Sequence, residues 1–187
     1  MKNRMICGIV LMLLLCMSCG MTTRKTLLAK CNGVHDEYPA DYNPAKDNLP
    51  FSRMISLHFF VYNKGGRSVQ IPLESNGVID TSEVIIQCRY KDKMAESLCV
   101  FDQMKKDEVI SSGDSTRAHI RLYEFSLHEL GIYDAPLDTI LKYLSIQYVR
   151  KNQDVNDESI DFLIDYHNVN RDYRPRSEIN VNYDYGL

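Results

Sequence analysis

The sequence ISLHFFVY, residues 55–62, decides the fold class of this chain. Every second residue is aliphatic or aromatic, which places one set on one face of an extended segment: Ile55, Leu57, Phe59 and Val61. A period of two is typical of a β-strand with one buried face. The turn sequence Asn63-Lys64-Gly65-Gly66 follows and predicts a hairpin with the alternating segment at 68–73.

Similar alternation recurs at 83–91, 97–101, 116–125, 144–149 and 160–167, and more weakly near 179–183. Only 134–144 has helical character, with Asp134 as its expected cap. The sequence therefore predicts an all-β fold, an antiparallel β-sandwich of about seven to eight strands with one short helical connection. The segments 60–66 and 112–114 also resemble the immunoglobulin-like sandwiches of exported bacterial proteins, which implies the same architecture.

The first nineteen residues predict where the protein works. Lys2 and Arg4 precede an apolar run at 5–17, which ends in Ser18-Cys19-Gly20. A basic head, a short apolar core and small residues are typical of a secretory signal. Its end resembles a bacterial lipoprotein signal, although Cys16 occupies the position that usually holds a leucine. The resemblance implies cleavage before Cys19, acylation of Cys19 and anchoring outside the cytoplasm, in the outer membrane of the bacterial cell envelope. An ordinary cleaved signal is the alternative.

The chain is then predicted to divide into three parts. Residues 1–18 form the signal peptide, 19–50 the lipidated cysteine with a polar tether, and 51–187 the β-sandwich domain with a C-terminal tail. A flexible tether of this length would span roughly 30 Å on average.

Composition restricts the class of partner. The full chain has 44% hydrophobic residues, as in a globular domain, and a net charge of −3, which becomes more negative when Lys2 and Arg4 are removed. Nucleic-acid binding requires a clustered basic face, so we expect no nucleic-acid partner. No sequence for binding a cofactor is found.

Three cysteines follow the anchor: Cys31, Cys88 and Cys99. If Lys93-Met94 form the tip of a hairpin, Cys88 faces Cys99, which would permit a disulfide in an exported protein. Buried free thiols are the alternative.

Ser115 raises the question of catalysis, because 113–115 resembles the Gly-Asp-Ser block of a serine hydrolase family. That family implies Ser115 as nucleophile and an Asp-x-x-His pair, but the nearest match, Asp165-Tyr166-His167, is one residue short. A nucleophilic serine needs a base and an orienting acid. We therefore expect a polar turn and no enzyme activity, with a serine hydrolase as the remote alternative.

Two acidic segments could suggest metal sites. His35-Asp36-Glu37 lies near Asp41, and Asp154, Asn156 and Glu158 imitate the start of a calcium loop that would end at Asp165. The first lacks a second histidine at ligand spacing and the second has Ser159 in place of the required glycine. A solvated loop is favoured for the first segment and a charged hairpin connection for the second, and no metal is expected.

Outward-facing aromatic, histidine and arginine side chains are typical of binding surfaces. On the predicted strands these are His58, Phe60, Tyr62, His119, Arg121 and Tyr123. The sequence favours a non-enzymatic lipoprotein that binds another envelope protein, as an assembly subunit, inhibitor or immunity protein. A glycan-binding or uptake accessory lipoprotein is the alternative, and a second buried face would also explain these residues.

Overall fold

The structure is a computed structural model that describes residues 27–38, 43, 45–48, 52–74, 76–102, 108–151 and 160–171. Several predictions lie outside the described residues: the signal peptide, Cys19, Asp41, Asp154, Asn156, Glu158, Ser159 and the C-terminal tail beyond residue 171.

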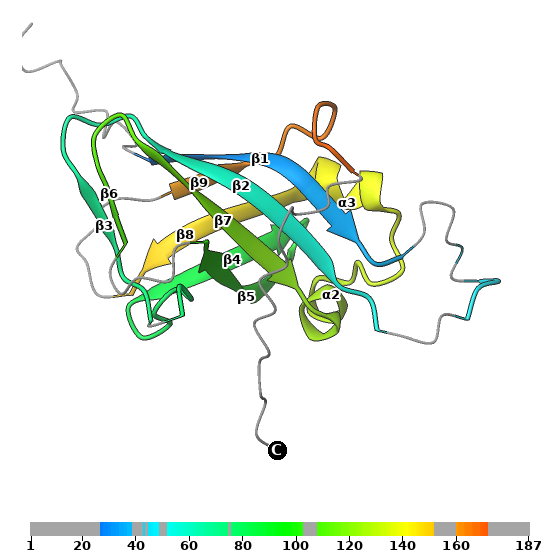
Figure 1. Cartoon of the computed structure of the whole chain (residues 1–187). Helices are drawn as coiled ribbons and strands as arrows, with labels where there is room; N and C mark the ends of the chain where they lie inside the picture. Colours follow the sequence, from blue (N-terminus) through cyan, green and yellow to red (C-terminus); the bar gives the residue numbers. More distant parts are fainter. Residues whose placement is uncertain are drawn as a thin grey trace, which may run out of the picture.

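The described residues form nine strands and two short helices (Figure 1). The strands are β1 (Leu27–Asp36), β2 (Ile55–Asn63), β3 (Val69–Ile71), β4 (Val84–Tyr90), β5 (Lys93–Phe101), β6 (Glu108–Ile110), β7 (Ser115–Leu122), β8 (Leu144–Arg150) and β9 (Ile160–Leu163). The helices are α2 (Glu124–Leu130) and α3 (Leu137–Tyr143).

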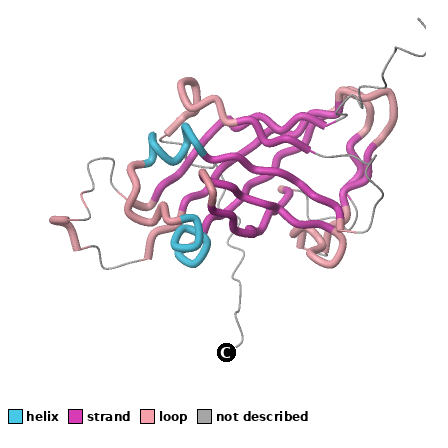
Figure 2. Tube along the Cα trace, turned by 180° about the vertical axis from the view of Figure 1, so that it is seen from behind, coloured by secondary structure: helices cyan, strands magenta, loops and turns pink. Residues whose placement is uncertain are grey.

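Seven of the strands close into a barrel in the order β1-β2-β7-β5-β4-β8-β9. Neighbours are antiparallel except at the closure, where β9 lies parallel to β1 and antiparallel to β8. The view from behind shows the strands curving around a common interior (Figure 2). Closure leaves no open sheet edge in this set of strands.

The predicted immunoglobulin-like β-sandwich is therefore wrong. Period-two patterning requires only that each strand has one buried face, and a closed sheet meets this requirement as well as two stacked sheets do. The closing pairs come from β1, whose residues the sequence assigned to the tether: it pairs with β2 from Leu27 to Asp36 and with β9 from Leu28 to Lys30. The barrel thus begins well before residue 51.

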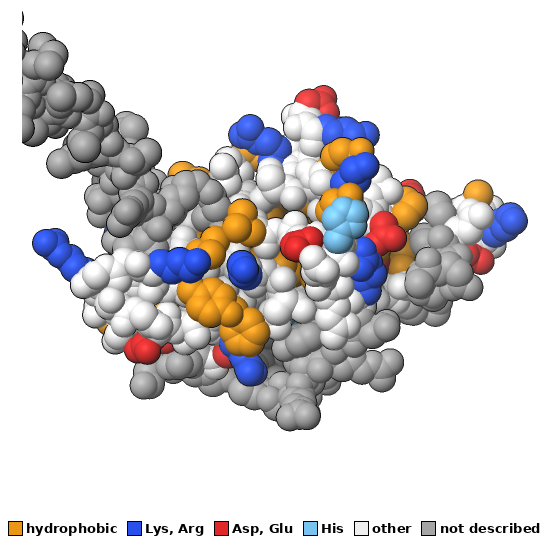
Figure 3. All heavy atoms as spheres, turned by 90° about the horizontal axis from the view of Figure 1, so that it is seen from above, with side chains coloured by type: hydrophobic (Ala, Val, Ile, Leu, Met, Phe, Trp, Pro, Cys, Tyr) orange, Lys and Arg blue, Asp and Glu red, His pale blue; other side chains and the backbone are white. Residues whose placement is uncertain are grey.

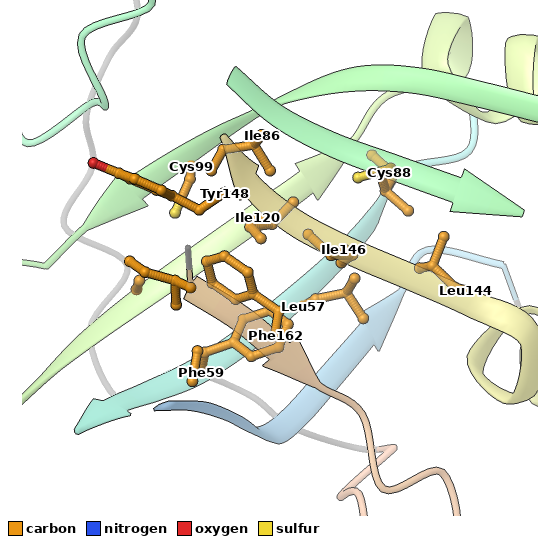
Figure 4. Close-up of a cluster of buried hydrophobic side chains, with 14 of the residues drawn as sticks. Leu57, Phe59, Ile86, Cys88, Cys99, Ile120, Leu144, Ile146, Tyr148 and Phe162 are labelled. Atoms are coloured by element: carbon orange, nitrogen blue, oxygen red, sulfur yellow. The ribbon is translucent and has the colours of Figure 1, made fainter. Parts of the chain in front are cut away.

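Side chains fill the interior of the barrel (Figure 4). Phe59 of β2 and Phe162 of β9 meet edge to face with ring centroids 4.9 Å apart. Tyr148 of β8 and Ile120 of β7 are also buried in this core. The inward face predicted for β2 is confirmed, and so is the alternation predicted at 83–91 and 116–125, because alternate residues of β2, β4 and β7 belong to one buried cluster.

The hairpin of β4 and β5 has a different register from the predicted one. It turns at Lys91-Asp92 rather than at Lys93-Met94, and Lys91 has a φ of 56°. Cys88 therefore faces Ala95, while Cys99 lies opposite Ile120 of β7.

A two-stranded arm of β3 and β6 extends from one end of the barrel (Figure 1). The predicted hairpin between β2 and β3 is wrong, because β3 pairs with β6 instead. The buried side chain of Asn63 holds the chain where it leaves the barrel for this arm. It donates hydrogen bonds to the carbonyls of Arg67 and Ile110 and accepts one from the amide of Gly65. The backbone of Asn63 also forms hydrogen bonds with the backbone of Gly113 and Asp114. The segment that follows β2 and the segment that precedes β7 therefore leave the barrel side by side.

The opposite end of the barrel carries α2 and α3 (Figure 1). The predicted helix is confirmed as α3, although Pro136 rather than Asp134 precedes its first turn. The sequence missed α2, because a helix of seven residues buries only Ser126, Leu127 and Leu130 and shows no clear helical period.

A buried ion pair fixes this end. The guanidinium of Arg53, just before β2, lies against the carboxylate of Asp36 at the end of β1, with contacts of 3.0 and 2.5 Å. It also donates to the carbonyls of Tyr133 and Ala135 between the helices. One side chain therefore holds together two strands and the connection from α2 to α3.

Candidate binding surface

Most residues of the predicted binding surface lie on two neighbouring strands. Within β2 and β7, His58 pairs with His119, Phe60 with Arg117, Ser56 with Arg121 and Tyr62 with Ser115. His58, Phe60, Tyr62, His119 and Arg121 are all half-buried on the outer face, which alternates with the buried core positions. Tyr123, also half-buried, directly follows β7 and precedes α2. The structure therefore places five of the six residues on the outer face of β2 and β7, where they fall into two groups, and places Tyr123 just beyond the end of β7.

The first group, which we call the histidine surface, consists of His58, Leu98, Asp102, His119 and Arg121. The imidazole rings of His58 and His119 lie 5.7 Å apart with an angle of 33° between their planes. Nδ1 of His119 is 3.5 Å from a carboxylate oxygen of Asp102. Leu98 of β5 pairs with Arg121, and its side chain is 40% exposed.

The pKa values of His58 and Asp102, which both lie beside His119, are shifted from their usual ranges. Burial, followed by repulsion from His119, lowers the pKa of His58 to about 4, so His58 is neutral near pH 7. A hydrogen bond from His119 lowers the pKa of Asp102 below its usual range. Nε2 of His119 is buried and has no hydrogen-bond partner among the described residues. The surface therefore combines a neutral imidazole, a carboxylate and the guanidinium of Arg121.

The second group, which we call the aromatic surface, consists of Leu28, Lys30, Phe60, Tyr62, Arg117 and Leu163. The rings of Phe60 and Tyr62 are 6.1 Å apart and inclined by 44°. The guanidinium of Arg117 lies over the ring of Phe60, 5.4 Å from its centroid. Strand pairing places Lys30 between Phe60 and Leu163, and Leu28 beside Tyr62.

Figure 3 views the molecule from the side of β1 and shows hydrophobic side chains gathered beside Lys and Arg side chains. Sequence reasoning missed Leu28, Lys30 and Leu163 as members of the aromatic surface. Their placement depends on the pairing of β1 with both β2 and β9, and the apolar residues at 27–29 give only a weak local signal for β1.

The three cysteines that the structure describes show no reactive arrangement. Cys31, Cys88 and Cys99 are free, and the register removes the facing pair on which the predicted Cys88–Cys99 disulfide depended. Burial raises the pKa of Cys31 and of Cys88 to about 12, and it raises that of Cys99 as well. A protonated, buried thiol is a poor nucleophile and a poor metal ligand.

The described residues of the two acidic segments belong to a strand or take part in hydrogen bonds within the fold. His35 and Asp36 belong to β1 rather than to a solvated loop, and Asp36 binds Arg53. Asp165 follows β9 and accepts hydrogen bonds from the amide of His167 and the side chain of Asn168. Within the described part of the chain, no group of three His, Cys, Asp or Glu residues could hold a metal ion.

The structure does not bring Ser115 and His167 together. Ser115 pairs with Tyr62, which pairs with Leu28, whereas the turn containing His167 leads to Asn170, which bridges Gly33. Leu28 and Gly33 are separated by five residues along β1, roughly 16 Å in a strand. Ser115 is exposed at the first position of β7.

Comparisons of the chain with protein families, with curated proteins and with solved structures find no match.

Neither described helix is long and apolar enough to cross a membrane.

Proposed function

We propose that this chain is a membrane-anchored lipoprotein of the bacterial cell envelope that binds another envelope protein through the histidine surface of its barrel. The anchor would be an acyl group on Cys19. The location rests on the N-terminal signal: Lys2 and Arg4, the short apolar run and the Ser18-Cys19 pair. Export would place the barrel outside the cytoplasm, tethered to the outer membrane.

The observation that carries the binding proposal is the adjacency of His58, His119 and Arg121 on β2 and β7. Arginine and aromatic side chains are enriched at the centres of protein interfaces because they combine apolar area with directed hydrogen bonds. The exposed Leu98 adds an apolar contact beside Arg121. This mixture of a guanidinium, imidazoles and an aliphatic side chain fits a protein surface.

Two further features support a protein partner on the outer face. Large side chains such as Tyr148, Phe59 and Phe101 occupy the barrel interior, so recognition is expected outside. Sugar stacking needs an open aromatic face, but Phe60 and Tyr62 are inclined to each other and Arg117 lies over Phe60. These contacts favour a protein over a glycan.

Site-specific photocrosslinking in intact cells tests the proposal. A photoreactive residue replaces Leu98 on the histidine surface or, as a control, Val149 on β8, because both side chains are 40% exposed. We expect one discrete protein adduct at position 98 and none at 149. Adding Arg121→Glu should abolish the adduct, whereas Gln147→Glu on β8 should leave it unchanged. Equal crosslinking at both positions, or an adduct that persists with Arg121→Glu, would contradict the proposed surface.

A further inference from the structure

The barrel is attached to its proposed anchor by a short segment. Because β1 begins at Leu27, only residues 20–26 separate the barrel from Cys19. The fully extended chain from Cys19 to Leu27 spans at most about 28 Å. As a flexible coil the same segment would span about 16 Å on average. The barrel must therefore stay close to the membrane that holds Cys19.

The aromatic surface begins where this segment enters the barrel. Leu28 is the second residue of β1, its side chain is half-buried on the outer face, and it pairs with Tyr62. Lys30 is exposed two residues later and pairs with Phe60 on one side and Leu163 on the other. Leu163 is 48% exposed. An apolar and aromatic area therefore lies within reach of the lipid surface.

The charges of this region suit anionic lipid headgroups. Between Cys19 and Asp36 the sequence contains Arg24, Lys25 and Lys30 but no acidic residue. Arg117 and the exposed Lys64 add positive charge near Phe60 and Tyr62. The described acids nearby are Asp161, which pairs with Leu28, Asp114, which precedes β7, and Asp102, which accepts a hydrogen bond from His119. Arg24, Lys25, Lys30, Lys64 and Arg117 outnumber these acids. Clustered lysines and arginines next to a membrane bind phosphate-bearing anionic lipids.

We infer that the aromatic surface rests on the membrane that holds Cys19, with Lys30, Lys64 and Arg117 against anionic lipid headgroups and the apolar side chains at the interface. Aromatic side chains favour this interface because their rings are apolar and their edges can be hydrated. The inference rests on the proposed acylation of Cys19. It leaves the histidine surface available for the proposed protein partner.

The absence of tryptophan from the chain allows a direct test. Leu163→Trp places one fluorophore on the aromatic surface, and Val149→Trp places one on an outward position of β8. The lipidated full-length mature proteins are reconstituted into vesicles of phosphatidylcholine with phosphatidylglycerol, with and without brominated acyl chains. We expect a blue shift and quenching for Leu163→Trp and neither for Val149→Trp. Vesicles of phosphatidylcholine alone should weaken the effect.

Reversing the charge of Lys30 and measuring lysine acetylation in the wild-type protein complete the test. Lys30→Glu should reduce the quenching of Leu163→Trp, whereas Lys142→Glu on α3 should not. In the unchanged protein, transfer from detergent to vesicles should slow acetylation of Lys30 several-fold relative to Lys142. Equal quenching of the two tryptophans, or unchanged acetylation of Lys30, overturns the membrane contact even if the Leu98 adduct forms. A mature chain without acyl groups overturns both the contact and the proposed anchoring.

Discussion

Arg53 and Asp36 form a buried ion pair in which the guanidinium and the carboxylate are joined by two hydrogen bonds, with side chains 2% and 7% exposed. Breaking a buried pair leaves an uncompensated charge. We predict that Asp36→Ala lowers the free energy of unfolding by about 3–5 kcal/mol. Asp138→Ala is the control, since its ion pair with Arg171 is exposed and should contribute little. Denaturant melts check both, and similar losses would contradict the structural role of Asp36.

Ile120 and Ser115 provide a test of the strand faces of β7. Ile120 is fully buried, so Ile120→Asp would place an unpaired carboxylate in the barrel interior and should cost several kcal/mol. Ser115 is exposed at the start of the same strand, so Ser115→Ala should change stability by less than about 0.5 kcal/mol. Thermal melts compare them. A stable Ile120→Asp variant would mean that the assigned faces are reversed, while loss of function in folded Ser115→Ala would revive the hydrolase hypothesis.

His58 should make stability depend on pH. Its pKa is lowered to about 4 in the folded chain, whereas an unfolded histidine has a pKa of about 6.5. The unfolded state therefore binds more protons between these values, and this contribution to stability is present above pH 6.5 and is lost as the pH falls towards 4. His58→Gln should flatten the loss of unfolding free energy in this range relative to wild type. The same pH profile in both proteins would show that His58 titrates normally.

The buried thiols should be inert in the folded protein. Cys88 and Cys99 are fully buried, free and not opposite each other, and burial raises the pKa of each. We expect a thiol reagent to modify them only after unfolding, and a reductant to leave the melting temperature unchanged. A lower melting temperature in reductant would indicate a disulfide and contradict this arrangement.

The sequence predicted strands better than it predicted their partners. Alternation identified β2, β4 and β7 because each has aliphatic or aromatic residues on one face and polar residues on the other. Alternation carries no information on pairing, so it could not show that β9 closes the sheet against β1. The sequence predicts the turn at 63–66 and the polar turn at 113–115 as separate features, although the hydrogen bonds of Asn63 join the two segments.

The sequence predicted the outward residues of the binding surface but could not predict which strands bring them together. His58 and His119 were assigned to outer faces correctly, and the pairing of β2 with β7 then placed them together. Leu28 and Lys30 could not be added from the sequence, because the proline-interrupted segment that follows them is typical of a tether. Arg53 gave no signal, since a single arginine before a strand is usually solvated.

Acylation of Cys19 is the claim on which both the proposed function and the membrane contact depend. Intact-mass measurement and N-terminal analysis of the protein purified from membranes test it directly. We predict a mature chain that begins at Cys19 and exceeds its polypeptide mass by acyl groups, while Cys19→Ser accumulates as an unlipidated precursor. A wild-type chain that begins at another residue with a free amine would contradict the account.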